Sequence, residues 1–208
     1  MDLHLLRLAL AHHIGQQLTP ELASRIEFIA RNGEDLAINP GDFEPMVVND
    51  YVIKVERLSE ILSEMRRLHE GFWSETDRTL MQDACMDVDY AGMAYLERAG
   101  RLVQFTARTT TGELIGQCRM YLSRSMHLGW LMAEDDTLYL APGHRGGFLA
   151  VHMLRYVERC LVDRLGVREI AANSKLSNNS GALMRRLGYE AMSERFVKFF
   201  PAPVARKG

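Results

Sequence analysis

The sequence of 208 residues predicts an α/β layer fold with a mixed sheet, preceded by a helical extension. Three observations lead to this prediction. Residues 3–14 and about 55–73 carry apolar side chains at three- and four-residue steps, as amphipathic helices do. From Arg101 apolar and polar residues alternate, which is typical of strands. Beyond residue 137, strand-like runs alternate with helical segments, and layered α/β folds show this order.

The composition excludes several classes of protein. A formal net charge of -2 gives no global attraction to nucleic acid or to an acidic membrane, so we expect neither as a partner. No apolar run reaches the roughly 18 residues of a membrane span. The three cysteines form no CxxC pair, which favours reduced thiols and a cytoplasmic protein. The apolar N-terminus lacks a signal-peptide cleavage site, so we expect no such peptide.

The N-terminal region, residues 1–50, is predicted to be a helical extension with a linker. Apolar residues at helical steps indicate a first helix over residues 3–14. Thr19 and Pro20 read as an N-cap and a first helical position, opening a second helix that runs to about Arg31. Residues 33–50 contain prolines and acids and are expected to form a loop. We therefore place the main domain at residues 51–208.

The middle of the chain changes from helix to strand. A third helix is expected from about Val55 to Trp73, and residues 90–98 are also expected to be helical. The stretch "RLVQFTAR", the turn "TTTG" and the stretch "ELIGQCRMYL" together predict a β-hairpin. Two further strands are expected at residues 128–132 and 137–141, on either side of the acidic cluster 134–136.

The last third predicts alternating helices and strands. A helix is expected from Gly146 or Gly147 to Leu165, where Gly166 ends it. The stretch "VREIAAN" predicts a strand, and "NNSGALMRRLG" predicts a short helix. One or two closing strands are expected in "YEAMSERFVKFF".

The stretch "LYLAPGHRGGFLAVHML", residues 138–154, joins a buried strand to a helix through a basic residue and two glycines. The first amides of a helix have no intrahelical acceptor and carry partial positive charge, so such a junction can hold a phosphate. It can equally be a tight connection. Neither GxGxxG nor GxxxxGK[ST] is present, so the residues alone leave both alternatives open.

The same stretch resembles the acyl-coenzyme A loop of the GNAT acyltransferase superfamily. The family pattern is Gln or Arg, two residues, Gly, one residue, then Gly or Ala; Arg145 and Ala150 fit its ends, and Phe148 replaces the middle glycine. "LMRRLGYE" is similar to the later family segment that ends in Leu-Gly-Phe or Leu-Gly-Tyr. The wording "YLERAGRLVQFTAR" resembles GNAT proteins encoded by tailed phages.

The resemblance covers about residues 55–200 and implies a mostly antiparallel twisted sheet flanked by helices. It implies transfer of an acetyl group from acetyl-coenzyme A to an amine of a small molecule or a protein. A backbone amide at a distortion of the fourth strand, near residues 138–140, would face the thioester. The cofactor contacts implied are Leu138, Tyr139, Leu140, Arg145, Gly146, Gly147, Phe148, Leu149, Ala150, Asn178 and Asn179.

Three residues are candidates for proton transfer. Glu134 could act as a base, with Asp135 and Asp136 beside it, although a solvated acidic turn explains the cluster as well. Tyr139 lies on the strand at the implied site, where packing is the alternative. His144 neighbours the glycine loop, where a surface histidine is the alternative. The family's usual tyrosine acid falls at Met184, which cannot donate a proton.

Other functions remain open at this stage. The protein could bind coenzyme A with little catalysis, as Met184 and Phe148 suggest. Residues 1–50 could dock on a partner or on a second copy, forming a homodimer. An unrelated nucleotide-binding protein is disfavoured by the missing glycine fingerprints. We expect no metal site: the spacing of Asp83, Asp87 and Asp89 lacks the glycine and glutamate of a calcium loop.

Overall fold

The computed structural model describes residues 6–7, 10, 13–32, 38–75, 85–174 and 180–198. The chain forms two compact units, residues 1–173 and 174–208, which are described separately. The strands are β1 (Met46–Val48), β2 (Tyr51–Val55), β3 (Leu102–Thr109), β4 (Leu114–Arg124), β5 (Leu131–Leu140) and β6 (Glu169–Ala171). The α-helices are α2 (Pro20–Asn32), α3 (Leu58–Glu75), α4 (Tyr90–Arg98), α5 (Leu149–Arg159) and α6 (Ser180–Arg186). Short helical turns are η1 (Pro40–Asp42), η2 (Pro142–His144) and the π-helical η3 (Cys160–Arg164).

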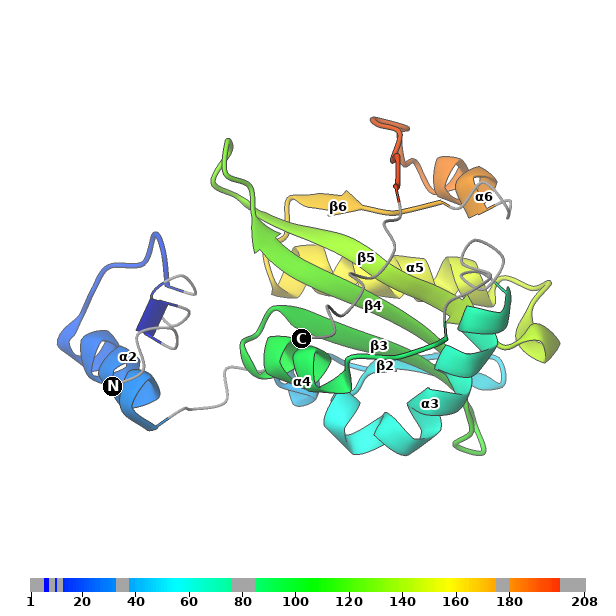
Figure 1. The fold of residues 1–208 in the computed structure, drawn as a ribbon, viewed down its shortest axis with the longest axis horizontal. Coiled ribbons are helices and arrows are strands. Elements are labelled where there is room, and N and C mark those ends of the chain that lie inside the picture. The colour runs from blue at the N-terminus through cyan, green and yellow to red at the C-terminus, as the bar shows by residue number, and fades with distance from the viewer. Residues whose placement is uncertain are drawn as a thin grey trace, which may run out of the picture. The chain divides into compact units, whose positions relative to one another are not determined.

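Within the described residues, the sheet has six strands in the order β1-β2-β3-β4-β5-β6 (Figure 1). Each neighbouring pair from β1 to β5 is antiparallel, and β6 alone runs parallel to its neighbour. The predicted mixed, mostly antiparallel α/β sheet is therefore confirmed. The predicted hairpin of "RLVQFTAR" and "ELIGQCRMYL" is the pair β3–β4, with Phe105 opposite Cys118.

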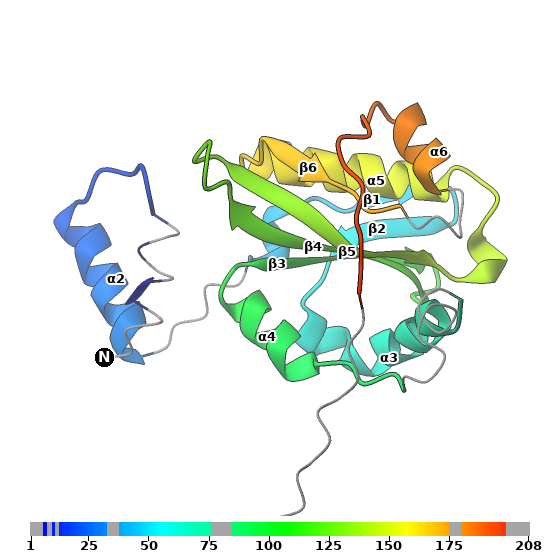
Figure 2. The same ribbon diagram turned by 45° about the horizontal axis from the view of Figure 1, so that its top comes forward.

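Helices cover both faces of the sheet, α3 and α4 on one side and α5 on the other (Figures 1 and 2). The apolar stripe of α5 includes Met153 and Tyr156, which are almost fully buried and join strand residues such as Phe105 in the larger core. Leu58 and Met65 of α3 form a second core on the opposite face. Burial of one stripe on each helix follows from the 3.6-residue period.

The first hairpin, β1–β2, was missed by the sequence analysis. It occupies the predicted loop and the predicted start of the third helix, and Val55 is the last residue of β2. Asn49 turns the chain between the strands with φ of 50°, a left-handed conformation that asparagine tolerates. Because β1 pairs with β2, part of the predicted extension belongs to the sheet. The division at residue 50 remains a prediction.

The expectation of two strands around an acidic turn was wrong. Residues 131–140 form one continuous strand, and the three acidic residues lie within it. The turn lies earlier, where the Ser125 amide donates to the Trp130 carbonyl and Gly129 has φ of 69°. The strand can hold these acids because two of them have partners nearby: Asp135 accepts a hydrogen bond from Asn173, and Asp136 lies 3.6 Å from Arg119 of β4.

Other boundaries shift by a few residues. Helix α5 begins at Leu149 rather than at the glycines, and it passes into the π-helical turn η3 before Gly166, whose φ is 70°. The strand predicted in "VREIAAN" is β6. Most of the first predicted helix, residues 3–14, lies outside the described residues.

The second unit contains α6, which confirms the predicted short helix. Gly188 follows it with φ of 94°. The predicted closing strands were wrong for residues 189–198, which form no strand. Met192 and Phe196 are each 88% exposed there, so the apolar pattern has no buried face in the described part of the chain.

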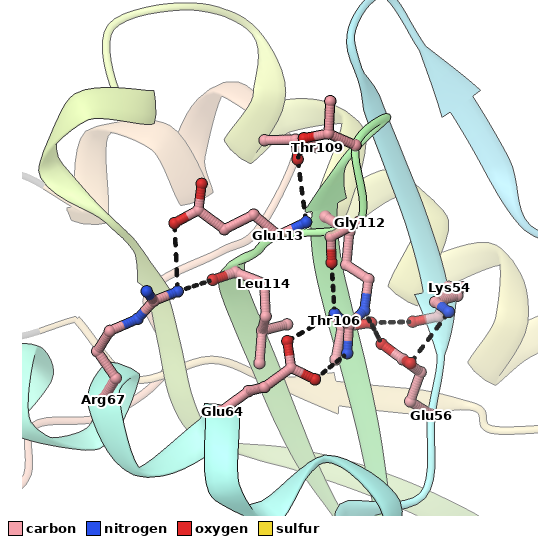
Figure 3. A network of polar contacts seen from close by, with 11 residues as sticks. Lys54, Glu56, Glu64, Arg67, Thr106, Thr109, Gly112, Glu113 and Leu114 are labelled. Atoms are coloured by element: carbon pink, nitrogen blue, oxygen red, sulfur yellow. Dashed lines mark hydrogen bonds and ion pairs between the residues drawn. The ribbon is translucent and has the colours of Figure 1, made fainter.

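A polar network fastens α3 to the β3–β4 hairpin (Figure 3). The Arg108 guanidinium donates to Glu56 at 2.8 Å and to both carboxylate oxygens of Glu64 at 2.8 and 2.9 Å. Thr106 also donates to Glu56, at 2.6 Å. Burial alone would raise the pKa of Glu56, but these donors lower it. The charges in this network are fully matched. None of the described helices is both long and apolar enough to cross a membrane.

Candidate active site

An open hollow of about 180 Å³ lies where β5 ends and α5 begins. Strand β5 stops at Leu140, and the turn η2 leads the chain to Gly146, whose φ is 96°. This left-handed conformation suits glycine, which explains its presence at the bend. The residues that line the hollow are Leu138, Leu140, His144, Arg145, Gly146, Gly147 and Ala150.

The hollow has the properties of an anion site. A Cβ atom added to Gly146 or Gly147 would meet no atom within 4 Å, so the backbone there is open to a ligand. The first amides of α5 follow immediately, and helix-start amides attract phosphate. Phe148, at the glycine position of the resembled pattern, has its side chain 73% exposed, which leaves the hollow unfilled. A phosphate therefore fits the backbone of this loop.

Arg145 is engaged with protein groups in this structure. Its Nη1 lies 2.8 Å from Oε2 of Glu75, and its Nη2 donates to Oε1 at 3.1 Å. Its Nε donates to the Leu140 carbonyl at 2.7 Å. Hydrogen bonds from Arg145 lower the pKa of Glu75. Arg145 thus ties the loop to the end of β5 and to the end of α3.

Tyr139 points toward α3, with 7% of its surface exposed. Its hydroxyl donates to Glu75 at 2.9 Å, and the Arg145 guanidinium lies 5.0 Å from its ring centre. Burial raises the pKa of the Tyr139 phenol, and the neighbouring Glu75 raises it further. The side chain therefore stays protonated at neutral pH. Its predicted role in proton transfer remains a prediction.

Strands β5 and β6 pair over only three residues, 132–134 with 169–171. Beyond that point Asn173 holds the end of β6: its amide and side chain donate to Asp135 Oδ1 at 2.6 and 2.9 Å. Burial raises the pKa of Asp135. In the described chain, residues 135–140 have a strand partner on the β4 side only. Among the described residues, the opposite edge of β5 beyond Asp135 thus has no paired strand, and this edge leads to the hollow.

Strand β5 is irregular at Asp136. Arg119 of β4 pairs with Thr137, whereas the next residue, Met120, pairs with Asp135. Asp136 is therefore an extra residue in β5, as in a β-bulge, which redirects side chains and frees backbone groups. The resemblance placed the distortion near residues 138–140, and the structure places it two residues earlier.

The bulge carboxylate faces a buried arginine. Arg119 is 1% exposed, and its Nη1 lies 3.6 Å from Asp136 Oδ2. Its Nη2 lies 2.6 Å from Nε2 of His69, whose Nδ1 lies 3.0 Å from the Tyr90 hydroxyl. Burial lowers the pKa of His69 to about 4, and the charge of Arg119 lowers it too. His69 is therefore neutral at pH 7.

The other predicted site residues are spread around the hollow. Glu134 is exposed on β5, and Asn173 Nδ2 lies 3.5 Å from its Oε1. His144 lines the hollow and shares a hydrogen bond of 3.2 Å with Tyr51. Leu149 is buried in the core, so only its backbone faces outward. Asn178 and Asn179 lie outside the described residues. Within the described ranges, no group of three metal-ligating side chains is found.

The fold was compared with known proteins. No protein-family model and no curated protein matches the sequence. A ribosomal-protein-alanine N-acetyltransferase from Brucella melitensis biovar Abortus 2308 is 18% identical, with a TM-score of 0.57 over 73% of this chain and 99% of its own. An aminoglycoside acetyltransferase from an uncultured soil metagenomic sample is 12% identical, with a TM-score of 0.58 over 76% of this chain and 100% of its own.

A third solved structure, AAC(6')-Iy with the bisubstrate analog CoA-S-monomethyl-acetylneamine, is 20% identical and has a TM-score of 0.53 over 74% of this chain and 99% of its own. The fold is that of the GNAT acetyltransferases. At these identities the likeness concerns the GNAT fold alone. Which residues act in it must come from the geometry of this chain.

Sequence reasoning missed the Arg119 site. The signal was present: Gln104 and Thr106 on β3 alternate with apolar residues, as do Gln117 and Arg119 on β4. All four are buried, which makes a polar stripe across the sheet face covered by α3. A stripe of polar residues at inward positions is uncommon and marks either a network or a site.

Proposed function

We propose that the protein transfers an acetyl group from acetyl-coenzyme A to an amine. The observation that carries the proposal is the hollow beside the open edge of β5. It combines an anion-accepting helix start, a glycine backbone without steric cover, and a strand edge that no other strand pairs within the described residues. A pyrophosphate and a flexible chain of amides have the chemistry that these groups recognise.

The proposed cofactor contacts follow the hollow. The backbone of residues 146–150 would receive the pyrophosphate, with Phe148 and Leu149 contributing amides. Leu138 and Leu140 would line the path of the acyl-carrying chain along β5. Arg145 would hold the loop in shape through Leu140 and Glu75, as its present hydrogen bonds suggest. Asn178 and Asn179 remain proposed contacts by resemblance.

The proposed chemistry is direct attack of the amine on the thioester. A free peptide N–H at the bulge would donate to the carbonyl oxygen as negative charge develops there. A carboxylate would accept the proton that the amine loses, and Glu134 and Asp136 are both exposed on β5. We favour Asp136, because it lies in the bulge itself. His144 and Tyr139 remain candidates for assisting departure of the thiolate.

The acceptor is proposed only by class, as a small-molecule or protein amine. Among the structures compared, some are aminoglycoside acetyltransferases and one is a ribosomal-protein-alanine N-acetyltransferase. Both kinds of acceptor present a primary amine. We further propose a cytoplasmic location, kinship with phage-encoded GNAT proteins, and a homodimer through residues 1–50, each from the sequence alone.

Two measurements test this function. Acetyl-coenzyme A at millimolar concentration should raise the melting temperature, because a ligand that binds only the native state stabilises it. Release of free thiol on addition of an amine panel should then report turnover. Stabilisation without thiol release would instead favour a coenzyme A-binding protein with little catalysis, as Met184 suggests. No stabilisation would refute both functions.

A substitution locates the binding site. Arg145→Ala should weaken acetyl-coenzyme A binding by about 10- to 100-fold, since it removes a charged hydrogen-bonding group from the loop. Arg155→Ala, an exposed arginine further along α5, is the matched control and should leave the affinity unchanged. Isothermal titration calorimetry measures both. Equal affinities for the two variants would place the cofactor away from this loop.

A further inference from the structure

We propose that Arg119 is a positioning residue that holds the bulge carboxylate Asp136 in place for proton transfer, with His69 and Tyr90 holding Arg119 in turn. This inference deepens the proposed acetyl transfer and rests on it. It assigns a role to a buried charge that neither the resemblance nor the comparisons identify.

The first argument is the cost of burying Arg119. A guanidinium that is 1% exposed has lost its hydration, and burial accordingly lowers its pKa. Asp136 is the one carboxylate that pairs with it within the described chain, at a long 3.6 Å. The other acceptors of its Nη atoms are neutral side chains, those of His69, Met93 and Gln117. The Nε of Arg119 is buried without a hydrogen-bond partner among the described residues. A charge placed so unfavourably for stability is better explained by a role in the site.

The second argument is the direction of the hydrogen bonds. The Arg119 Nη2 donates to His69, so the acceptor at Nε2 carries no proton. The proton of neutral His69 is then on Nδ1, which donates to the Tyr90 hydroxyl at 3.0 Å. Tyr90 is the first residue of α4, and its ring stacks on His69 with centres 5.6 Å apart. This series of hydrogen bonds therefore holds Arg119 in place through His69 of α3 and Tyr90 of α4.

The third argument is position along the strands. Arg119 pairs with Thr137, directly beside the extra residue of the bulge. The Thr137 hydroxyl donates to Asp136 Oδ2 at 3.0 Å, the same oxygen that faces Arg119. One carboxylate oxygen is thus engaged from two sides. Asp136 is itself exposed on β5, so an acceptor amine can reach its carboxylate.

The electrostatic surroundings of Asp136 come from four elements. Arg119 supplies the positive charge, and His69 is neutral at pH 7. Tyr121 interacts with Asp136 and stays protonated, because burial raises its pKa. The groups that face this region are Arg119 and Tyr121 from β4, His69 from α3, Asp89 from the start of α4, and Asp135 from β5. Loss of Arg119 would leave Asp136 among negative and neutral groups.

The test is a double-mutant cycle on acetyl transfer by the full-length protein. Arg119→Met and Asp136→Asn should each lower kcat by about 100-fold, the scale of general base catalysis, with the KM for acetyl-coenzyme A nearly unchanged. The double variant should be no slower than either single variant, because both remove one function. Arg119→Lys should recover part of the rate.

The split between kcat and KM separates positioning from a purely structural role. In Arg119→Met, kcat per folded molecule should fall while the KM for acetyl-coenzyme A is kept, and recovery in Arg119→Lys would tie the loss to the positive charge. Arg108→Met is the matched control: it removes a second arginine from the same sheet face and should leave kcat per folded molecule unchanged. Each variant is assayed well below its Tm, so that the measured kcat refers to fully folded protein.

Three outcomes would count against the inference. Wild-type kcat in Arg119→Met would overturn it while leaving the proposed function intact. Additive losses in the double variant would assign Arg119 to stability rather than to positioning. Absence of thiol release from the wild-type protein across the amine panel would overturn the proposed function and this inference together.

Discussion

Arg108 and Arg119 occupy adjacent strands on the same face of one sheet, yet their surroundings differ in kind. Arg108 is 12% exposed and meets two carboxylates, Glu56 and Glu64, with three hydrogen bonds of 2.8 to 2.9 Å (Figure 3). Arg119 is almost fully buried and donates to His69, to the Met93 sulfur and to the Gln117 side-chain oxygen, with one carboxylate 3.6 Å away. The first arrangement matches its charges, and the second surrounds a positive charge mainly with neutral groups.

The difference teaches how to separate structural from functional charge in a fold of this kind. A network in which every charge has an opposite partner stabilises the fold by joining secondary-structure elements. Replacing one member alone leaves its partners unpaired. A mismatched buried charge costs stability, so its presence needs another reason. Three predictions test this contrast, from the largest expected effect to the smallest.

The two arginines should respond oppositely to the same substitution. Arg108→Met should lower the free energy of unfolding by about 3 kcal/mol, because it removes the guanidinium shared by Glu56 and Glu64 and leaves Glu56 paired with Lys54 alone. Arg119→Met should change it by less than about 1 kcal/mol, because loss of hydrogen bonds to His69 is offset by removal of a desolvated charge. Urea unfolding followed by circular dichroism measures both. Equal losses would erase the distinction between the two sites.

His69 should make the protein less stable in mild acid. Its folded pKa of about 4 lies below the unfolded value near 6.5, so the unfolded chain binds more protons between these pH values. Stability is therefore complete above pH 6.5 and falls as the pH drops toward 4, by about 2 kcal/mol at pH 5.

His69→Gln keeps an acceptor for Arg119 and cannot titrate. The difference in unfolding free energy between wild type and this variant should therefore change by the same amount from pH 7 to pH 5. The carboxylates of the Arg108 network are present in both proteins and cancel in the difference. A pH-independent difference would mean that His69 titrates normally.

The exposed ion pair at the edge of the Arg108 network, Arg67 with Glu113, should contribute least to the free energy of unfolding. Arg67 and Glu113 lie 3.3 Å apart, but their side chains are 61% and 54% exposed. Arg67→Ala should lower the free energy of unfolding by less than about 0.5 kcal/mol, since water screens such a pair. A loss as large as that of Arg108→Met would show that exposure is a poor guide to these interactions. The same urea titration measures it.

Much of the architecture could be predicted from the sequence. Apolar residues recur with a helical period in α3, α4 and α5 and alternate with polar residues in β3 and β4. Such patterns arise where an element buries one face, so these elements could be predicted. The glycine junction was found because proline, glycine and helix-start signals act locally. The β1–β2 hairpin, with its turn at Asn49, was missed because strands of three and five residues have too few positions to show a period.

The acidic cluster shows why the site itself was harder to predict. Glu134, Asp135 and Asp136 look alike in sequence, and a solvated turn explains three adjacent acids. In the structure Asp135 holds Asn173, Asp136 faces Arg119, and Glu134 is exposed. Their partners lie 17 to 38 residues away along the chain, so only tertiary structure distinguishes them. The interpretation of the acidic cluster as a solvated turn was wrong for that reason.

Gly71 has a consequence for stabilising this protein by design. It lies inside α3, where glycine is usually unfavourable and alanine is the standard replacement for raising thermal tolerance. Here a Cβ would overlap the Tyr139 hydroxyl, so the phenol that donates to Glu75 would have to shift. A generic rule for thermostabilisation would thus disturb a hydrogen bond to the same carboxylate that holds Arg145 at the hollow.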